Sequence, residues 1–357
     1  MAGLSPRRRV ALAGVALVTV LAGLARYISG VPHVAAFVIA GIALGGAAWV
    51  VSFATEQVGE RFGPAVTGLM QSTLGNLPEL FVVIFALRAG HLVVAQTAIL
   101  GSILVNALLV LGMVIVVGSW REPDKVMRFS ARLPNDTATL LLIASFIIVL
   151  VALADTSHDS ASHHITAISI VGAIVILIVY GTWIVQYLGT EHPTDEPGDG
   201  PAPQRLPIAT SVTLLILGGL ASALVSAWFV NALEPTIHSL GISQSFAGLV
   251  IVAIAGNAVE HSVGIVLAAK GQPELAISVV KNSVAQIAAF MYPLLVLLSL
   301  LTATTLTFAL APIYAGALLG TSVIVWQITG DGEGTPFEGV ALMAAFVILA
   351  VVAAFEQ

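Results

Sequence analysis

Long apolar stretches alternate with short polar segments along almost the whole chain of 357 residues. About twenty apolar residues are enough for one helix to cross the hydrocarbon core of a bilayer. The stretches are continuously apolar and do not alternate every second residue, which favours helices over the strands of a barrel. The pattern predicts eleven membrane-spanning helices, over residues 10–28, 32–53, 63–88, 92–118, 136–154, 164–188, 207–231, 243–269, 274–301, 303–329 and 336–355.

The composition supports an all-α polytopic membrane protein embedded in a lipid bilayer. Hydrophobic residues make up 58% of the chain, charged residues make up 9%, and the mean hydropathy is +1.02. So few charges cannot cover the surface of a soluble protein, which excludes a soluble enzyme. The net charge of −6 and the scattered basic residues exclude a nucleic-acid partner. The chain has no cysteine, so disulfides, thiolate metal sites and thiol catalysis are excluded as well.

The placement of lysine and arginine predicts the orientation of the helices. Arg7, Arg8 and Arg9 precede the first span. If they are cytoplasmic, the positive-inside rule is obeyed by most other basic residues, because the following lie on the same side: Arg61, Arg121, Lys125, Arg128, Arg132, Arg205 and Lys270. Only Arg26 and Arg88 fall on the opposite face, and Lys281 falls inside a helix. We therefore expect a cytoplasmic N-terminus, and the short loops suggest a bacterial inner membrane.

One segment, residues 189–206, is rich in proline, glycine and acidic residues and divides the chain into halves. Its composition is typical of a solvated flexible connector, and it is also compatible with a cytoplasmic segment that attracts cations. The expected organisation is an extra N-terminal helix over 1–31, a first five-helix repeat over 32–188, the acidic linker over 189–206 and a second five-helix repeat over 207–357. Because five is odd, the two repeats must cross the membrane in opposite senses.

An internal similarity between the halves locates a candidate site. Residues 73–113 align without gaps on 254–294, and this brings Gly75-Asn76-Leu77-Pro78-Glu79 onto Gly256-Asn257-Ala258-Val259-Glu260. The same alignment pairs Ser102 with Ser283. Inverted repeats of this kind are the architecture of secondary transporters, whose sites lie near the bilayer midplane. We therefore expect Glu79 and Glu260 to meet near mid-membrane.

The energetics of these two carboxylates indicate what they do. A charged carboxylate at the bilayer centre costs at least about 2.5–3.5 kcal/mol on insertion scales. Protons neutralise such a group, and so does a bound cation. Exchange between the two states is antiport, so Glu79 and Glu260 are predicted to bind cations and protons. No cofactor is expected beyond these transported ions, and the sequence gives no oligomeric state.

The neighbouring residue types indicate which cation is bound. Neutral oxygen ligands are available from Asn76, Asn257, Ser102, Ser283 and Gln286. Local unwinding that frees backbone carbonyls is expected near Gly75, Pro78, Gly256 and Gly101. An all-oxygen site with two carboxylates suits a hard divalent ion such as Ca²⁺, whereas Mg²⁺ demands stricter geometry. Sodium stays an alternative if one carboxylate is protonated.

These residues resemble the calcium/cation antiporter superfamily, and most closely its cation/proton exchanger (CAX) branch. The resemblance covers roughly residues 32–355 and rests on strings similar to the two repeats of that family: Thr73-Leu74-Gly75-Asn76-Leu77-Pro78-Glu79-Leu80, residues 101–112, Gly256-Asn257-Ala258-Val259-Glu260-His261 and Gln286-Ile287. It implies a Ca²⁺/H⁺ exchanger in which Glu79 and Glu260 are the metal ligands and alternate between cation and protons. Asn76, Asn257, Ser102, Ser283 and Gln286 would line that site.

Two basic residues lie beside the motif. The chain reads Lys281-Asn282-Ser283 where the family usually has Gly-Ser. Lys281 either points away from the site and extends toward the cytoplasm, or its ammonium pairs with a core carboxylate and mimics a bound cation. His261 follows Glu260 and either relays or tunes protons or hydrogen-bonds a neighbouring helix.

Other functions also use carboxylates inside a membrane. A monovalent cation antiporter that moves Na⁺ or K⁺ against protons is the nearest alternative. A passive cation channel also lines its pore with carboxylates, but inverted halves favour alternating access. A membrane-embedded zinc enzyme is excluded because Asn257 stands where the inverted zinc motif requires a histidine. The protein is therefore not expected to be an enzyme.

Overall fold

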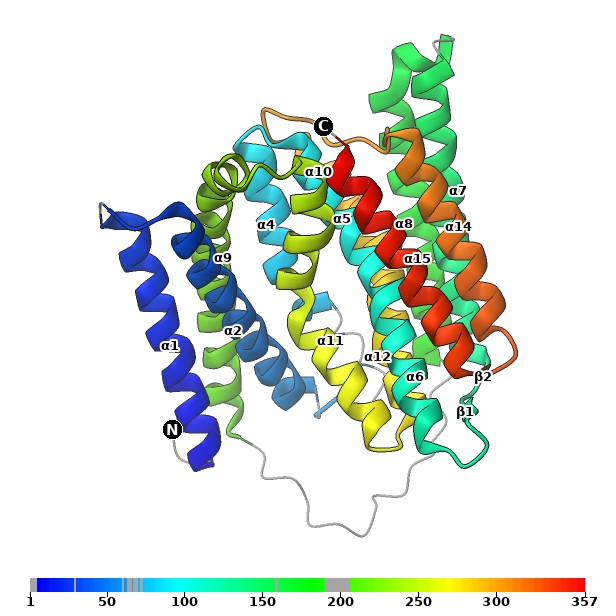
Figure 1. The fold of residues 1–357 in the computed structure, drawn as a ribbon, viewed down its shortest axis with the longest axis horizontal. Coiled ribbons are helices and arrows are strands. Elements are labelled where there is room, and N and C mark those ends of the chain that lie inside the picture. Colours follow the sequence, from blue (N-terminus) through cyan, green and yellow to red (C-terminus); the bar gives the residue numbers. More distant parts are fainter. Residues whose placement is uncertain are drawn as a thin grey trace.

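The computed structural model describes residues 5–28, 30–59, 61, 62, 66, 70, 73–157, 160–189 and 206–356, and these form a bundle of long helices (Figure 1). Ten of the helices in the described part are long and apolar enough to cross a membrane. This agrees with the all-α polytopic fold expected from the apolar pattern. The acidic linker expected at 189–206 lies almost wholly outside the described residues.

The helices, with their bounds, follow one another along the chain: α1 (Pro6–Tyr27), α2 (His33–Gly59), α4 (Leu77–Arg88), α5 (Leu92–Leu104), α6 (Leu111–Arg121), α7 (Arg132–Ser157), α8 (Ile165–Gly189), α9 (Ile208–Leu240), α10 (Gln244–Phe246), α11 (Ala253–Ala269), α12 (Pro273–Gln286), α13 (Tyr292–Ser299), α14 (Pro312–Thr329) and α15 (Pro336–Phe355). Three π-helical segments join neighbouring helices: η1 (Val105–Val110), η3 (Ala247–Val252) and η4 (Ile287–Met291). A short 3₁₀ helix, η2, spans Ser160–His164, and a two-stranded ribbon pairs β1 (Met127–Arg128) with β2 (Glu333–Gly334).

Several predicted spans differ from the structure at their ends. The helix expected over 207–231 is α9, which continues to Leu240 and contains Pro235 in its interior. The helix expected over 63–88 is described from Leu77 onward as α4, and most of 63–72 lies outside the described residues. Polar residues are therefore poor predictors of where a helix ends, because α9 contains Glu234 and Pro235 and continues beyond them.

The span predicted over 303–329 begins too early. The helix, α14, starts at Pro312, and residues 303–311 have no helical structure. The preceding helix ends at Ser299, whose hydroxyl accepts a 2.8 Å hydrogen bond from the backbone N–H of Leu306. Thr302 also turns its hydroxyl onto backbone carbonyls. Side chains that bond the local backbone in this way compete with a helix, and proline then fixes the new start.

The helices of the two halves contact one another in reciprocal pairs. The first helices of the two halves, α2 and α9, pack along each other, and so do α7 and α14. Helix α4 packs on α9, while α11 packs on α2; likewise α6 packs on α15, while α8 packs on α13. With α1 added, α2 and α9 form a layer at one side of the bundle (Figure 1).

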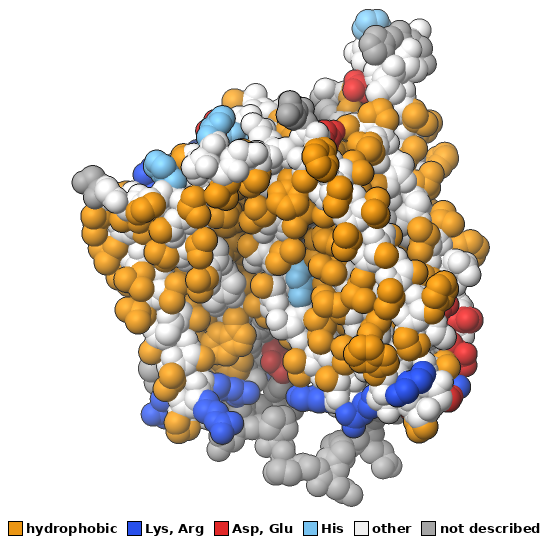
Figure 2. Space-filling model, viewed as in Figure 1, with side chains coloured by type: hydrophobic (Ala, Val, Ile, Leu, Met, Phe, Trp, Pro, Cys, Tyr) orange, Lys and Arg blue, Asp and Glu red, His pale blue; other side chains and the backbone are white. Residues whose placement is uncertain are grey.

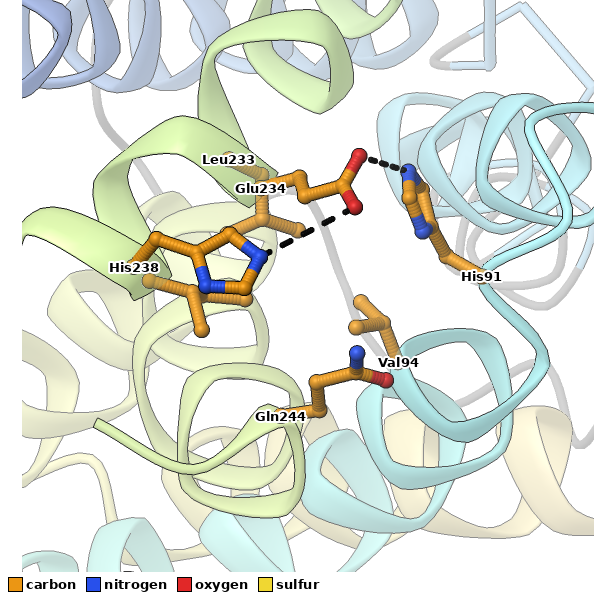
Figure 3. Close-up of a pocket in the computed structure, with 7 residues that line it drawn as sticks. His91, Val94, Leu233, Glu234, His238 and Gln244 are labelled. Atoms are coloured by element: carbon orange, nitrogen blue, oxygen red, sulfur yellow. Dashed lines mark ion pairs between the residues drawn. The ribbon is translucent and has the colours of Figure 1, made fainter. Parts of the chain in front are cut away.

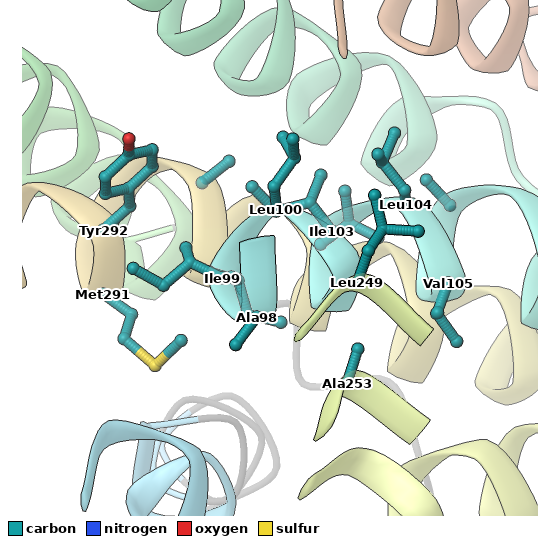
Figure 4. Close-up of a cluster of buried hydrophobic side chains, with 14 of the residues drawn as sticks. Ala98, Ile99, Leu100, Ile103, Leu104, Val105, Leu249, Ala253, Met291 and Tyr292 are labelled. Atoms are coloured by element: carbon teal, nitrogen blue, oxygen red, sulfur yellow. The ribbon is translucent and has the colours of Figure 1, made fainter. Parts of the chain in front are cut away.

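The buried centre of the bundle is where α5 crosses the segment formed by η3 and the start of α11 (Figure 4). Two glycines allow this close approach. A Cβ added to Gly101 would lie 2.6 Å from Cα of Leu249, and one added to Gly248 would lie 2.9 Å from the carbonyl oxygen of Val94. Small residues let membrane helices approach in this way, so that backbone packs on backbone. The crossing places α5 beside the motif helix α11.

Charged side chains gather at the two ends of the bundle and leave an apolar belt between them (Figure 2). Lysine and arginine are concentrated at the end that carries the β ribbon, as Figure 2 shows on the visible face. There Arg128 lies 2.7 Å from Asp124 and 3.3 Å from Glu333. Hydrogen bonding to Arg128 holds the pKa of the exposed Asp124 carboxyl below its usual range.

Candidate functional site

Glu79 lies in the first turn of α4, where an irregular backbone position precedes the helix. Asn76 is not helical, and Pro78 occupies the start of α4, where its missing N–H leaves no bond unmade. Only 2% of Glu79 is exposed, and neither carboxylate oxygen has a hydrogen-bond partner among the described residues. Ser102 and Asn257 interact with this carboxylate through their polar side chains, and Glu260 interacts with it through its charge. The helix break expected at Gly75 and Pro78 is therefore present.

Glu260 comes from α11, in the other half of the chain, and its carboxylate is held by a short relay. The hydroxyl of Ser283 in α12 donates to Oε2 of Glu260 at 2.5 Å. The side-chain amide of Asn106 in η1 donates to the Ser283 hydroxyl at 3.3 Å, so the single Ser283 proton is directed to the carboxylate. The relay that holds this acid thus uses residues from both halves of the chain.

The two motifs cross each other at their glycines. A Cβ added to Gly75 would lie 3.0 Å from Oε1 of Glu260. A Cβ added to Gly256 would lie 3.8 Å from Cβ of Glu79. Each glycine therefore faces the glutamate of the opposite half. The structure brings the two sequence-predicted carboxylates together, as the alignment of the halves required.

Neutral oxygen atoms complete the surroundings of the acids. Asn257 donates to Ser102 at 2.8 Å and to the carbonyl of Ala253 at 3.1 Å. Gln286 is buried in α12, interacts with Tyr180 and has a side-chain oxygen without a hydrogen-bond donor in the described part of the chain. Asn76 is buried beside the break before α4. Of the expected lining residues, Ser102, Asn257 and Ser283 thus lie at the carboxylates, whereas Asn76 precedes α4 and Gln286 ends α12, and their part in the site stays a prediction.

Among the described residues, no basic side chain neutralises the acids. No ion pair joins Glu79 or Glu260 to lysine, arginine or histidine within the part of the protein that the structure describes. In the same residues, no group of three histidine, cysteine or acidic side chains is placed to hold a metal ion. The donor set is therefore two carboxylates with amide and hydroxyl oxygens, which suits a hard cation such as Ca²⁺ rather than a transition metal.

The expectation that Gly256 and Gly101 unwind their helices is wrong. Gly256 lies inside the regular helix α11, and Gly101 lies inside α5. The irregular backbone occurs instead in η3, upstream of Gly256, and in η1, downstream of Gly101. Gly101 serves the close crossing with Leu249, so a glycine in an apolar helix here marks contact between backbones and not a break.

Lys281 points away from the site, as one of the two interpretations expected, but it remains buried and pairs with neither glutamate in the described structure. Its side chain is 2% exposed, so it does not extend to the water at the cytoplasmic end. Its ammonium donates to the hydroxyl of Thr329 in α14 at 3.2 Å and forms no ion pair with either glutamate in the described structure. Two residues along a helix turn a side chain through about 200°, so Lys281 faces away from the side of α12 that presents Ser283.

His261 is also buried, and its Nε2 has no hydrogen-bond partner among the described residues. Its proposed role in moving or tuning protons therefore stays a prediction.

Two polar residues at the site escaped the sequence analysis. Asn106 orients Ser283, and Ser226 of α9 donates to the carbonyl oxygen of Pro78 at 3.2 Å. Asn106 had a usable signal, because it is a buried amide in a long apolar stretch, one helical turn after Ser102. Ser226 had none, because serine is common in membrane helices and only the packing of α9 on α4 gives it a role.

Comparison with known proteins agrees with this architecture. A family model described as "Sodium/calcium exchanger protein" matches residues 32–188 and 210–355. A vacuolar calcium ion transporter of Schizosaccharomyces pombe is 32% identical over 311 residues, which are 84% of this chain and 74% of that protein. A Ca²⁺/H⁺ antiporter of Synechocystis is 31% identical over 336 residues, which are 88% of this chain and 89% of that one.

Solved structures show the same fold. The structure of native YfkE is 25% identical and superposes with a TM-score of 0.79, covering 97% of this chain and 99% of the other. The crystal structure of an H⁺/Ca²⁺ exchanger, CAX, has a TM-score of 0.76 at 17% identity and covers 98% and 91% of the two chains. The matched family segments take in both glutamate motifs and nearly all of the helical bundle. The chain therefore belongs to the sodium/calcium exchanger protein family.

Proposed function

We propose that this protein is a secondary active antiporter that exchanges Ca²⁺ for protons, with Glu79 and Glu260 as the groups that bind both ions. One observation carries the proposal. Two carboxylates from opposite halves of the chain, Glu79 buried and Glu260 partly buried, share one site, and no basic side chain pairs with either of them in the described structure. Inside a membrane such charges must be neutralised by something that arrives from outside the protein.

The same carboxylates cannot hold Ca²⁺ and protons at once, and this exclusion couples the two flows. Protonation removes the negative charge that attracts the cation, and a bound divalent cation removes the charge that attracts protons. Asn257, Ser102, Ser283 and Gln286 are proposed as neutral oxygen ligands or as groups that orient the acids. The names of the relatives support Ca²⁺ and protons as the two exchanged ions, since the Synechocystis protein is a Ca²⁺/H⁺ antiporter and the yeast protein is a calcium ion transporter.

Alternating access requires two halves that can move against each other, and we propose that 32–188 and 207–357 are inverted repeats. Three observations support this. The helices of the halves contact each other in reciprocal pairs. The π segments η1 and η4 follow the two serine-bearing helices at corresponding places. Gly75 and Gly256 face the glutamates of the opposite halves.

The orientation in the membrane is part of the same proposal. Basic side chains are concentrated at the end of the bundle that carries the β ribbon (Figure 2). The positive-inside rule assigns that end, together with the N-terminal arginines, to the cytoplasm. We propose that the protein lies in a bacterial inner membrane and moves Ca²⁺ out of the cell as protons enter.

Flux measurements in proteoliposomes test the function. With a pH gradient imposed, the wild-type protein is expected to move Ca²⁺ against its own gradient, and Glu79→Gln or Glu260→Gln should abolish this flux. Glu274→Gln is the matched control, because Glu274 is a carboxylate at the start of α12 that accepts from the backbone N–H of Ser130, away from the site. Normal uptake by either site variant contradicts the proposal, provided that the variants elute as folded protein.

Ion competition in the same assay separates the alternatives. Ca²⁺ is expected to drive proton release, while Na⁺ and K⁺ leave the pH unchanged. Proton release driven by Na⁺ or K⁺ instead would show a monovalent antiporter. Ca²⁺ flux that is independent of the pH gradient and exceeds any carrier turnover would show a channel.

A further inference from the structure

A small pocket lies at the end of the bundle opposite the β ribbon, where three segments meet (Figure 3). Its lining comes from the last turns of α9, from the corner between α4 and α5, and from the start of α10: His91, Val94, Leu233, Glu234, Ile237, His238 and Gln244. Glu234 extends from α9 across the pocket toward His91, which precedes the first residue of α5 (Figure 3). The pocket therefore lies between the last turns of α9 and the corner between α4 and α5.

Two imidazoles converge on the single carboxylate of Glu234. Nε2 of His91 lies 3.5 Å from one oxygen, and Nε2 of His238 lies 4.0 Å from the other. The His91 side chain is 17% exposed, Glu234 is 53% exposed, and His238 is 75% exposed. His238 stands one turn after Glu234 on the same helix, so only the His91 contact joins two different elements. It is also the less exposed of the two and hence the less screened by water.

We propose that His91 and Glu234 form a pH-sensitive tie that fastens the end of α9 to the corner between α4 and α5. A protonated imidazole forms an ion pair with the carboxylate, whereas a neutral imidazole does not, and histidine ordinarily changes charge near pH 6.5. The ionisable side chains that line the pocket are His91, Glu234 and His238; Gln244, on the α10 side, is neutral. Arg88, in the last turn of α4, precedes His91 along the chain and does not line the pocket.

The tie acts on a helix that reaches the glutamate site. About two turns before Glu234, Ser226 of the same helix donates to the carbonyl oxygen of Pro78, at the break in front of Glu79. Helix α9 also packs along α2 and α1, which form the layer at the side of the bundle. A restraint on the end of α9 therefore restrains the element that contacts the break. The consequence for transport rests on the proposed antiport, but the tie itself does not.

Spin-label distances test the tie without any transport. The chain has no cysteine, so Val93→Cys in α5 and Leu240→Cys at the end of α9 give one labelled pair with no background. Both positions are exposed. The distance distribution is expected to be narrower at pH 5.5 than at pH 8. The expected change in the tied population is about two- to fivefold, the size of a partly exposed ion pair.

Four variants in this labelled background decide the outcome. Glu234→Gln keeps the shape of the side chain and should remove the pH dependence, and His91→Asn should do the same. His238→Asn should retain it, and so should His163→Asn in η2, the control for a general effect of losing a histidine. Identical distributions at both pH values overturn the proposal. It is also overturned if Glu234→Gln keeps the narrowing, or if His238→Asn removes it while His91→Asn does not.

A transport assay tests the regulatory role of the tie separately. In proteoliposomes held at equal pH on both sides, Ca²⁺ counterflow at pH 5.5 is expected to be about two- to fivefold faster in Glu234→Gln than in the wild-type protein, with equal rates at pH 8. An unchanged counterflow together with a pH-dependent distance shows that the tie does not limit transport and overturns only its regulatory role. Loss of all counterflow in the wild type contradicts the proposed antiport and leaves the distance result standing.

Discussion

At the scale of single residues, the two glycines at the crossing of the motifs are expected to tolerate an added methyl group differently. Gly75 faces a carboxylate oxygen of Glu260, while Gly256 faces only Cβ of Glu79 at ordinary contact distance. An added methyl group therefore displaces a proposed ligand in one case and fills open space in the other. The pair offers a matched test of whether the position of Glu260 matters for transport.

We expect Gly75→Ala to lower the rate of Ca²⁺/H⁺ exchange at least about tenfold, since misplacing a ligand by a fraction of an ångström weakens its interaction with the ion. Gly256→Ala, in the regular part of α11, should keep exchange within about twofold of the wild type, because alanine is a better helix former than glycine. Initial rates in proteoliposomes measure both. Equal losses in the two variants would show that the site does not depend on the Gly75 contact.

Lys281 gives a second prediction at this scale. Its ammonium has three donors and one partner in the described structure, the hydroxyl of Thr329. A buried donor without enough acceptors costs about 1–3 kcal/mol, so Lys281→Met should raise the free energy of unfolding by that order. Because the side chain faces away from Glu260, the Ca²⁺ affinity should not change.

Thermal unfolding in detergent and Ca²⁺ titration measure these two quantities. Lys270→Met, at the exposed end of α11, is the control and should alter neither. An increase in Ca²⁺ affinity for Lys281→Met alone would show that the ammonium competes with the ion after all.

At the scale of the elements, the fold depends on the crossing of α5 with η3. A Cβ at Gly101 would meet backbone atoms of Leu249, which cannot move aside as a flexible side chain can. Gly101→Ala should therefore push the two helices apart and lower the free energy of unfolding by about 1–3 kcal/mol.

Thermal unfolding measures this effect, and Gly316→Ala provides the matched comparison. Gly316 lies inside α14 with nothing within 4 Å of an added Cβ, so its variant should be neutral or slightly more stable. Equal stability of the two variants would contradict the importance of the crossing.

The elements were predicted well where their apolar pattern is long and uninterrupted, and poorly where polar residues bond the local backbone. The start of α5 and both ends of α8 fall close to the expected positions. The start of α14 is later than expected, because Ser299 and Thr302 bond the local backbone and the segment after them is not helical. The end of α9 is also later than expected, because Pro235 lies inside the helix and does not end it. Hydropathy records the cost of burying side chains, but it does not record which backbone groups they bond.

At the scale of the whole molecule, the distribution of basic residues predicts the orientation. His163 in η2 and Lys270 after α11 should lie on opposite sides of the membrane. In intact cells, a membrane-impermeant maleimide should label His163→Cys and leave Lys270→Cys unlabelled until the cells are broken. The chain contains no other cysteine that would give a background signal.

A permeant maleimide, which should label both variants, controls for reactivity. The reverse pattern would place the N-terminus outside and would invert the proposed direction of transport.

The sequence by itself determined the membrane class, most of the helices and the two motif glutamates, because each of these follows from a large energetic cost. An apolar stretch must avoid water, and a carboxylate in a stretch that lies in lipid must be neutralised. Such requirements hold whatever the neighbouring helices are. These features can therefore be predicted from the sequence alone.

Only the tertiary structure decided which groups meet. Asn106 reaches Ser283, Ser226 reaches the break at Pro78, and Lys281 turns toward Thr329, each across a contact between distant parts of the chain. Gly101 proved to be a point of close packing and not a break. These outcomes depend on how helices rotate and approach one another, and the spacing of polar residues along a single helix does not specify its partner.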